Sequence, residues 1–181
     1  MKKAIFITGT PCTGKTTVSE ALSEKLGCKL IKINDLAIEN DFVLGIDEDK
    51  GYKVIDIDAL NDKVSEIISE SDELTIFEGH LAHLCSGADK VIVLRVHPEI
   101  LCTRLEERNY SESKIRENLE AEAMGVCTAE AFDEYGDKIS EIDFTDLSID
   151  EIANIVTDII LDKVDFPVGE IDFMEWLIST P

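Results

Sequence analysis

The sequence predicts an α/β protein in which a central parallel sheet is covered by helices on both faces. Short apolar segments of strand length alternate along the chain with amphipathic helical segments. The first strand segment leads directly into GTPCTGKT (9–16), which matches the phosphate-loop pattern G-x-x-x-x-G-K-[S/T]. Together these observations indicate a three-layer P-loop NTPase fold.

Five segments are expected to form the strands of this sheet. They are AIFIT (4–8), KLIKI (29–33), LTIFEG (74–79), KVIVLRV (90–96) and EIDFT (141–145). Mostly apolar runs of this length are typical of strands that are buried on both faces of a parallel sheet.

The segments between the strands carry helix start and stop signals. Asp58 is expected to cap a helix, Pro98 to open one, and SIDE (148–151) to form a capping box. The expected helices cover residues 15–26, 58–69, 98–108 and 111–135, and a further helix follows 148. Residues 34–57 are expected to be an irregular acidic lobe, and FMEWLI (173–178) a docked last turn.

The composition is that of a single globular domain over residues 1–181. With 44% hydrophobic content the chain can bury a core, and it has no apolar run long enough to cross a bilayer. The apolar run after the first two lysines reaches Gly9 too soon for a signal peptide. Five cysteines without a C-x-x-C pair fit reduced thiols, so we expect a cytoplasmic protein.

The chain is strongly acidic. It has 39 acidic and 17 basic residues, a formal net charge of −22, and this charge repels a phosphate backbone, so broad nucleic-acid binding is not expected. The acidity serves either solubility or a basic protein partner. The four arginines lie in one short segment, which suggests a local site for an anion. They are Arg95, Arg104, Arg108 and Arg116.

The phosphate-loop pattern predicts ATP binding. Gly9 and Gly14 let the backbone curl so that its N–H groups face a polyphosphate at the start of a helix. Lys15 is expected to reach the β- and γ-phosphates, and the Thr16 hydroxyl to ligate Mg²⁺. Thr17 follows in the first helical turn, near the α-phosphate.

An acidic residue near the metal is expected at the end of a neighbouring strand. Glu78 ends a mostly apolar strand segment and is the candidate, with a solvent-exposed glutamate as the alternative. His80 is expected beside the γ-phosphate or a catalytic water, and His83 to be structural. A metal cluster of these side chains with Cys85 remains an alternative, although the spacing fits no standard zinc pattern.

The segment RLEERNYSESKIREN (104–118) suggests a lid. Arg104 and Arg108 lie four residues apart on one helix face, and the helix is expected to break at 109–110. A cation at such a hinge suits closure over phosphates, which excludes water and stabilises the transferred oxygens. The alternative is that these arginines, with Arg116, pair with neighbouring glutamates on the surface.

The chain resembles the adenylate kinase type 6 family of archaeal and eukaryotic proteins. The phosphate loop, EGH (78–80), RLEERNY (104–110) and the EW near the C-terminus carry the resemblance, which extends over nearly the whole chain. It implies a nucleoside monophosphate (NMP) kinase fold with a short lid, here about 107–117, and Mg²⁺-dependent, broad-specificity NMP kinase activity with ATPase activity. It also implies a basic small-subunit ribosomal protein as partner and a role in maturation of that subunit.

The resemblance also implies roles for individual residues. The implied ATP-phosphate contacts are Cys12, Gly14, Lys15, Thr16 and Thr17. Glu78 and His80 would form an acid-x-His element, Arg108 would contact ATP at the start of the lid, and the loop at 145–147, which includes Leu147, would lie against the adenine.

Three positions depart from the family pattern. Cys12 and Asn109 stand where glycine is usual, and asparagine tolerates left-handed geometry. Ile38 stands where a cation commonly faces the acceptor. The candidate acceptor-binding residues of the 34–57 lobe are Asp35, Lys50 and Lys53, and either lysine is a substitute for the missing cation.

Two functional hypotheses follow. The first is an Mg²⁺-dependent kinase that moves the γ-phosphoryl group of ATP to a nucleoside monophosphate, with AMP as the first candidate. The second is an ATPase that acts as an assembly switch on a basic ribosomal protein, which the net charge and Ile38 favour. Another small-molecule P-loop kinase is a third reading.

Overall fold

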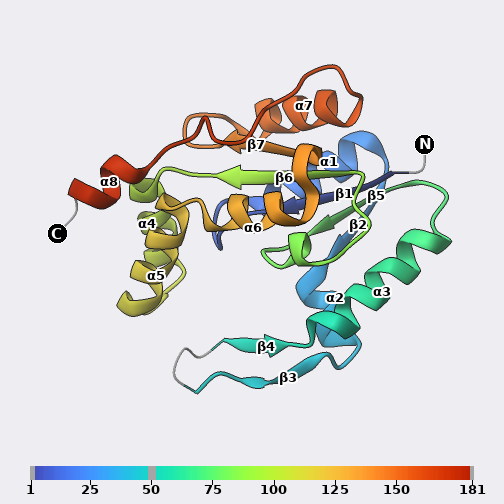
Figure 1. The fold of residues 1–181 in the computed structure, drawn as a ribbon, viewed down its shortest axis with the longest axis horizontal. Helices are drawn as coiled ribbons and strands as arrows, with labels where there is room; N and C mark the ends of the chain where they lie inside the picture. The colour runs from blue at the N-terminus through green and yellow to red at the C-terminus, as the bar shows by residue number, and fades with distance from the viewer. Residues whose placement is uncertain (1–2, 49–51, 180–181) are drawn as a thin grey trace.

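The computed structural model describes residues 3–48 and 52–179 and has a central sheet of five parallel strands (Figure 1). In chain order these are β1 (Lys3–Thr8), β2 (Lys29–Lys32), β5 (Leu74–Glu78), β6 (Lys90–Arg95) and β7 (Ile139–Asp143). Their order across the sheet is β2-β5-β1-β6-β7, and every neighbouring pair is parallel. The predicted α/β fold is therefore confirmed, although β7 begins two residues earlier than predicted.

The helices complete the fold. They are α1 (Lys15–Leu26), α2 (Ile33–Glu39), α3 (Ile57–Glu70), α4 (Pro98–Glu107), α5 (Glu112–Ala123), α6 (Val126–Tyr135), α7 (Ile149–Ile160) and α8 (Met174–Ser179), with short 3₁₀ turns η1 (Ala82–Leu84) and η2 (Gly136–Lys138). No helix of the described residues is long and apolar enough to cross a membrane.

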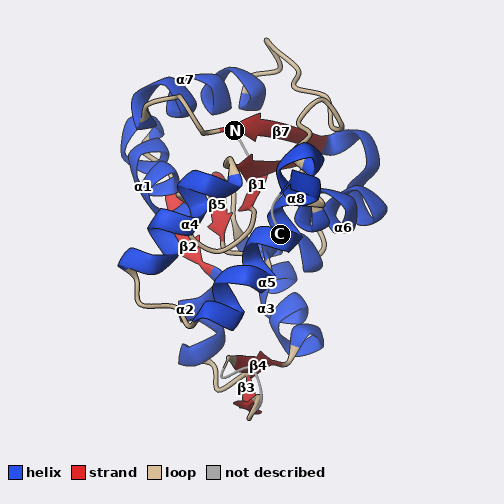
Figure 2. Ribbon diagram, turned by 90° about the vertical axis from the view of Figure 1, so that its left-hand side faces the viewer, coloured by secondary structure: helices blue, strands red, loops and turns tan. Residues whose placement is uncertain are grey.

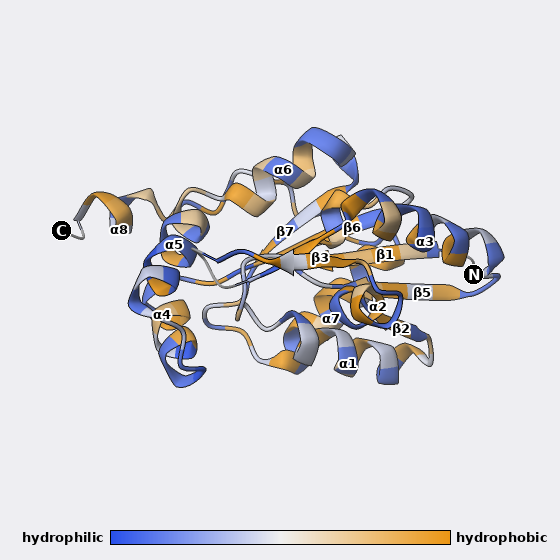
Figure 3. Ribbon diagram, turned by 90° about the horizontal axis from the view of Figure 1, so that it is seen from below, coloured by the Kyte–Doolittle hydropathy of each residue, from blue (hydrophilic) through white to orange (hydrophobic). Residues whose placement is uncertain are grey.

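The two faces of the sheet bury separate apolar clusters because side chains alternate along each strand. On β1, Ile5 and Ile7 belong to the cluster that α1 and α7 cover, whereas Phe6 belongs to the cluster that α3 and α6 cover. All three side chains are fully buried. Figure 3 shows α1 and α7 on one side of the sheet and α6 on the other.

The lobe at residues 34–57 is more regular than predicted. Its described part contains α2 and an antiparallel hairpin of β3 (Val43–Ile46) and β4 (Lys53–Ile55), which projects from the body of the molecule (Figure 2). Leu44 and Ile46 are about two-thirds exposed. The hairpin thus lacks the alternation of apolar buried and polar exposed residues by which a half-buried strand is recognised in a sequence. The hairpin therefore gave a weak sequence signal.

The predicted helix 111–135 is wrong, because the chain forms two helices there. α5 ends at Ala123 and α6 begins at Val126. Gly125 lies between them with φ of 66°, a left-handed conformation that interrupts helical geometry. The predicted break after Arg108 is present, and Asn109 lies there with φ of 57°.

The helix caps are only partly as predicted. Ser148 and Glu151 form the predicted capping box at the start of α7. The cap of α3 is Asp56 and not Asp58, because the Asp56 carboxylate accepts a hydrogen bond from the Ala59 N–H at 3.0 Å. At the other end of the chain, α8 packs Trp176 against the cluster covered by α1 and α7.

Candidate active site

The phosphate loop, residues 9–16, joins the end of β1 to the start of α1. Gly9 has φ of 141° and Gly14 has φ of 99°, values that side chains rarely allow. Space is restricted as well: a Cβ on Gly9 would lie 2.5 Å from the Leu94 carbonyl oxygen, and a Cβ on Gly14 would lie 2.5 Å from the Phe144 ring. The loop thus curls at the N-terminus of α1, where N–H groups and the helix dipole favour an anion.

Cys12 has a left-handed backbone conformation, which is more usual for glycine. Its φ is 68°, and Asn109 also has a left-handed φ, of 57°. The Cys12 carbonyl oxygen accepts a hydrogen bond from Arg104 Nη1 at 3.3 Å. The loop geometry is therefore retained without glycine at this position, and α4 is tied to it.

Lys15 is folded back into the loop. Its ammonium group donates hydrogen bonds to the carbonyl oxygens of Gly9 (2.9 Å) and Thr10 (2.8 Å), and the residue is 8% exposed. Burial lowers the pKa of Lys15, while Glu78 is among the nearby groups that oppose this shift. An incoming phosphate would offer this buried cation a fully charged partner.

Thr16, the last residue of the loop, and Glu78 bring two oxygen atoms close together. The Thr16 hydroxyl donates to Glu78 Oε1 at 3.1 Å, and Glu78 is 7% exposed. Glu78 ends β5 and lies level with Ile7, two residues before the phosphate loop begins. A hydroxyl and a buried carboxylate fit Mg²⁺, which typically takes one or two protein oxygens and fills its other positions with phosphate and water.

The two histidines after β5 have different surroundings. Burial and the nearby Lys15 lower the pKa of His80 to about 4, so its imidazole is neutral at pH 7. His83 is buried and lies between the Thr8 hydroxyl (2.7 Å from Nδ1) and Glu130 (3.0 Å from Nε2). The described residues contain no group of three or more metal-ligating histidine, cysteine or acidic side chains.

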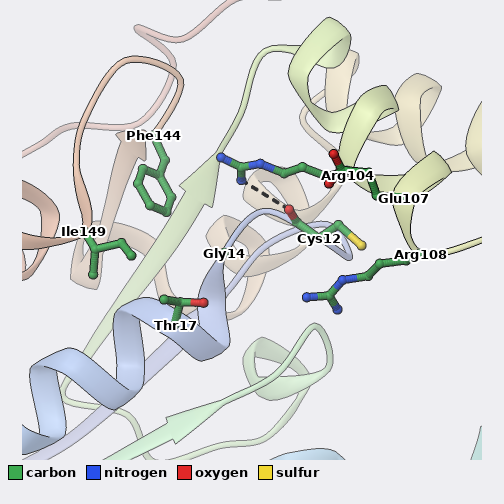
Figure 4. Close-up of a pocket in the computed structure, with 8 residues that line it drawn as sticks. All are labelled: Cys12, Gly14, Thr17, Arg104, Glu107, Arg108, Phe144 and Ile149. Carbon is green, nitrogen blue, oxygen red and sulfur yellow. Dashed lines mark hydrogen bonds between the residues drawn. The ribbon is translucent and has the colours of Figure 1, made fainter.

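A cavity of about 260 Å³ opens beside the phosphate loop (Figure 4). Arg104 of α4 and Arg108, which follows α4, extend toward the loop, and the Arg104 guanidinium lies 5.4 Å from the centre of the Phe144 ring. Arg108 is exposed and follows the last residue of α4. The lining residues are Cys12, Gly14, Thr17, Arg104, Glu107, Arg108, Phe144 and Ile149.

Sequence reasoning missed Phe144 and Ile149 as cavity residues. Phe144 directly follows β7, at the carboxyl edge of the sheet where ligands of open α/β folds bind. Its place at the end of a predicted strand could have identified it as a candidate ligand contact. Leu147 packs against the apolar core nearby but does not line the cavity.

The other predicted residues lie away from this cavity. Asp35 lines a separate hollow beside β2 with Lys29 and Lys32, and Lys53 is exposed on β4. Lys50 lies outside the described residues. Neither Asp35 nor Lys53 lines the cavity over the phosphate loop.

The clustering of the four arginines in the sequence predicted one anion site, and this prediction is wrong. Arg95 is buried with Glu122 and Glu141, and Arg116 pairs with Glu120 at 2.9 Å on an exposed helix face. Only Arg104 and Arg108 line the cavity. Proximity in the sequence was misleading because β6, α4 and α5 point these side chains in different directions.

Comparison with known proteins identifies the family. Residues 5–125, more than half of the chain, match the protein family described as "AAA domain". A protein named "Putative adenylate kinase" from Methanothermobacter thermautotrophicus is 46% identical over 175 residues, covering 97% of this chain and 99% of that protein. The chain therefore belongs to the "AAA domain" family and to a family of archaeal proteins named "Putative adenylate kinase". A further member with the same name, from Pyrococcus furiosus, is 41% identical and covers 93% of this chain and 90% of its own.

Solved structures extend the similarity at the level of the fold. A shikimate kinase from Acinetobacter baumannii has a TM-score of 0.64 and 15% identity, over 88% of this chain and 93% of that one. A gluconokinase from Sinorhizobium meliloti has a TM-score of 0.58, also at 15% identity, over 99% and 98%. The family thus shares its three-layer architecture with P-loop kinases of small molecules.

Proposed function

We propose that the protein is an Mg²⁺-dependent NMP kinase that transfers the γ-phosphoryl group of ATP to a nucleoside monophosphate, with AMP as the first candidate. The observation that carries the proposal is the convergence of Lys15, the Thr16–Glu78 pair and the two arginines of α4 around one phosphate loop. Phosphoryl transfer needs such positioning and charge stabilisation more than it needs covalent chemistry. The names of the archaeal relatives point to the same reaction.

The loop residues would bind the polyphosphate. Lys15 would exchange the Gly9 and Thr10 carbonyls for phosphate oxygens, while Thr17 would lie near the α-phosphate. Thr16 and Glu78 would hold Mg²⁺, which neutralises charge that develops on the phosphates. The backbone N–H groups of Cys12 and Gly14 would complete the phosphate contacts.

The remaining assignments complete the site. Arg108, at the turn of a lid over about 107–117, would meet the transferred phosphoryl group, and neutral His80 would orient a nucleophile or water near it. Leu147 would support the adenine. The lobe at 34–57 would receive the acceptor, with Asp35, Lys50 and Lys53 as its polar contacts.

A second candidate is an ATPase switch that binds a basic ribosomal protein during maturation of the small ribosomal subunit. Two observations favour it: Ile38 is 47% exposed on α2 where the family pattern has a cation, and the net charge is −22. Both functions would use the same phosphate loop.

The deciding experiment measures ADP formation from ATP and Mg²⁺, alone and with each common nucleoside monophosphate. Strong stimulation by one acceptor supports the kinase, whereas a rate that is indifferent to all of them supports the ATPase. Lys15→Ala should lower either rate by at least about 100-fold, because it removes a fixed cation from the phosphates. Near-normal turnover by this variant would contradict both candidates.

A further inference from the structure

A buried ion network lies behind the phosphate loop, away from the cavity. Arg95, at the end of β6, pairs through Nε with Glu122 of α5 at 2.9 Å and through Nη1 with Glu141 of β7. All three side chains are at most 3% exposed. The C-terminal segment covers the network, because Gly169 N–H donates to Glu141 at 3.0 Å and the Phe173 ring lies 5.2 Å from the Arg95 guanidinium.

Glu122 connects this network to the phosphate loop. Its Oε1 accepts from Arg95 Nε and from Val96 N–H at 3.0 Å, while its Oε2 accepts from the Thr10 hydroxyl. The Thr10 carbonyl oxygen in turn accepts from Lys15 Nζ at 2.8 Å and from Thr13 Oγ1 at 2.9 Å. One residue of the loop thus contacts both Glu122 and the phosphate-binding lysine.

The charge balance makes the Thr10 contact costly to lose. Two carboxylates face one guanidinium, and burial opposes the charge on Arg95 while Glu122 and Glu141 raise its pKa. A buried carboxylate that lacks a donor is destabilised by its lost hydration. Glu122 therefore fixes the position of Thr10 relative to the end of α5.

We propose that Glu122 is a positioning residue, which acts through Thr10 to couple the placement of α5 to the placement of Lys15. α5 begins immediately after the lid turn, at Glu112, and Glu122 lies near its other end. A helix transmits displacement along its length, so movement of the lid during phosphoryl transfer would reach the peptide that holds Lys15. The role rests on the proposed function, and it is additional to the nucleotide contacts.

Three variants separate this coupling from simple destabilisation. Thr10→Val removes the hydroxyl at nearly constant shape, and Thr10→Ser restores it. Thr128→Val is the matched control, because the Thr128 hydroxyl donates to Glu141 at 2.7 Å in the same network but is not part of the phosphate loop. We expect Thr10→Val to lower kcat about 10- to 100-fold, and Thr10→Ser to recover most of that loss because it restores the hydroxyl. Thr128→Val should stay within a few-fold of the wild type.

Hydrogen exchange tests the coupling without relying on turnover. Addition of ATP and Mg²⁺ should slow amide exchange over residues 112–123 in the wild type, in Thr10→Ser and in Thr128→Val, but not in Thr10→Val. Equal protection of α5 in Thr10→Val and Thr128→Val, or no protection in the wild type, would overturn the inference. A wild type that forms no ADP with any acceptor yet shows the expected exchange pattern would contradict the proposed function and leave the coupling supported.

Discussion

The two arginines over the phosphate loop are held differently. Arg104 is fixed by its hydrogen bond to the Cys12 carbonyl and its packing on Phe144, whereas Arg108 is exposed at the C-terminus of α4. A residue that is already fixed suits ground-state binding of ATP. Arg108, at the turn between α4 and α5, would suit an interaction that forms only on closure of the proposed lid.

Arg108→Ala should therefore lower kcat with little change in ATP affinity. We expect a loss of about 10³-fold or more, by analogy with arginines that stabilise transferred phosphoryl groups elsewhere. Arg108→Lys should not restore the rate fully, because an ammonium cannot reproduce the planar fork of donors. Steady-state kinetics with calorimetric ATP titration separates the two effects.

Arg116→Ala is the control for this prediction. Arg116 lies on the next helix and pairs with Glu120 on an exposed face, so its loss should leave kcat unchanged. An unchanged kcat in Arg108→Ala would remove Arg108 from the proposed mechanism.

Glu78→Gln should lose most of the Mg²⁺-dependent turnover and bind Mg²⁺ more weakly. The substitution keeps the shape of the side chain and the hydrogen bond from Thr16 but removes the charge that would face the metal. We expect kcat to fall at least about 100-fold and the Mg²⁺ concentration at half-maximal rate to rise. Thr16→Ser, which keeps the hydroxyl, is the matched control and should retain most activity. If Glu78→Gln has the same dependence on Mg²⁺ concentration as the wild type, Glu78 has a structural role and does not bind the metal.

At the scale of elements, the sequence predicts what is local and buried. The strands were predictable because mostly apolar runs mark full burial, and the phosphate loop because its pattern lies within eight residues. The hairpin of β3 and β4 was not predictable from the sequence, because Leu44 and Ile46 are exposed. The contact of Thr10 with Glu122 spans 112 positions and depends on tertiary packing, which no local pattern encodes.

A second element-level feature joins the end of α7 to the sheet. Asp162, two residues after α7, pairs with Lys3 of β1 at 2.9 Å and with Lys90 of β6 at 2.7 Å. The hydrogen bonds from Lys90 and then Lys3 lower the pKa of Asp162 to about 2. Because the folded-state pKa is depressed, the stabilisation is present above the ordinary aspartate pKa and is lost as the pH falls toward 2.

Asp162→Asn should therefore lower the thermal stability modestly at pH 7. Asparagine accepts the left-handed φ of 57° at this position, so the loss reports on charge and not on backbone strain. The difference in Tm from the wild type should shrink as the pH falls below about 4 and should decrease with added salt, since the pair is exposed. Asp158→Asn, which breaks a single exposed pair with Lys163, should have a smaller effect; a constant difference at all pH values would contradict the ion-pair account.

At the scale of the whole molecule, the site is a small cationic region in an acidic protein. Arg104 and Arg108 line the cavity beside the phosphate loop, and Lys15 lies within that loop, while the chain as a whole carries 39 acidic and 17 basic residues. An anionic substrate such as ATP would thus meet repulsion at long range and attraction only near the loop. The same imbalance acts on the folded protein itself, because like charges are brought closer together on folding.

This self-repulsion predicts that salt stabilises the fold. The screening length falls from about 30 Å at 0.01 M salt to about 8 Å at 0.15 M, so added salt removes the long-range repulsion among the acidic residues. It also weakens favourable surface pairs such as Lys3 with Asp162, but these are individually weak and the excess of carboxylates is large. The Tm measured by calorimetry should therefore rise between 0.01 and 0.15 M sodium chloride, at a rate of about 2–4 °C for each 1 kcal/mol gained in a domain of this size. Potassium chloride should give the same rise if screening is the cause, because screening depends on ionic strength and not on the identity of the cation. A Tm that falls or stays constant over this range would show that local ion pairs, and not the net charge, dominate the electrostatic free energy of folding.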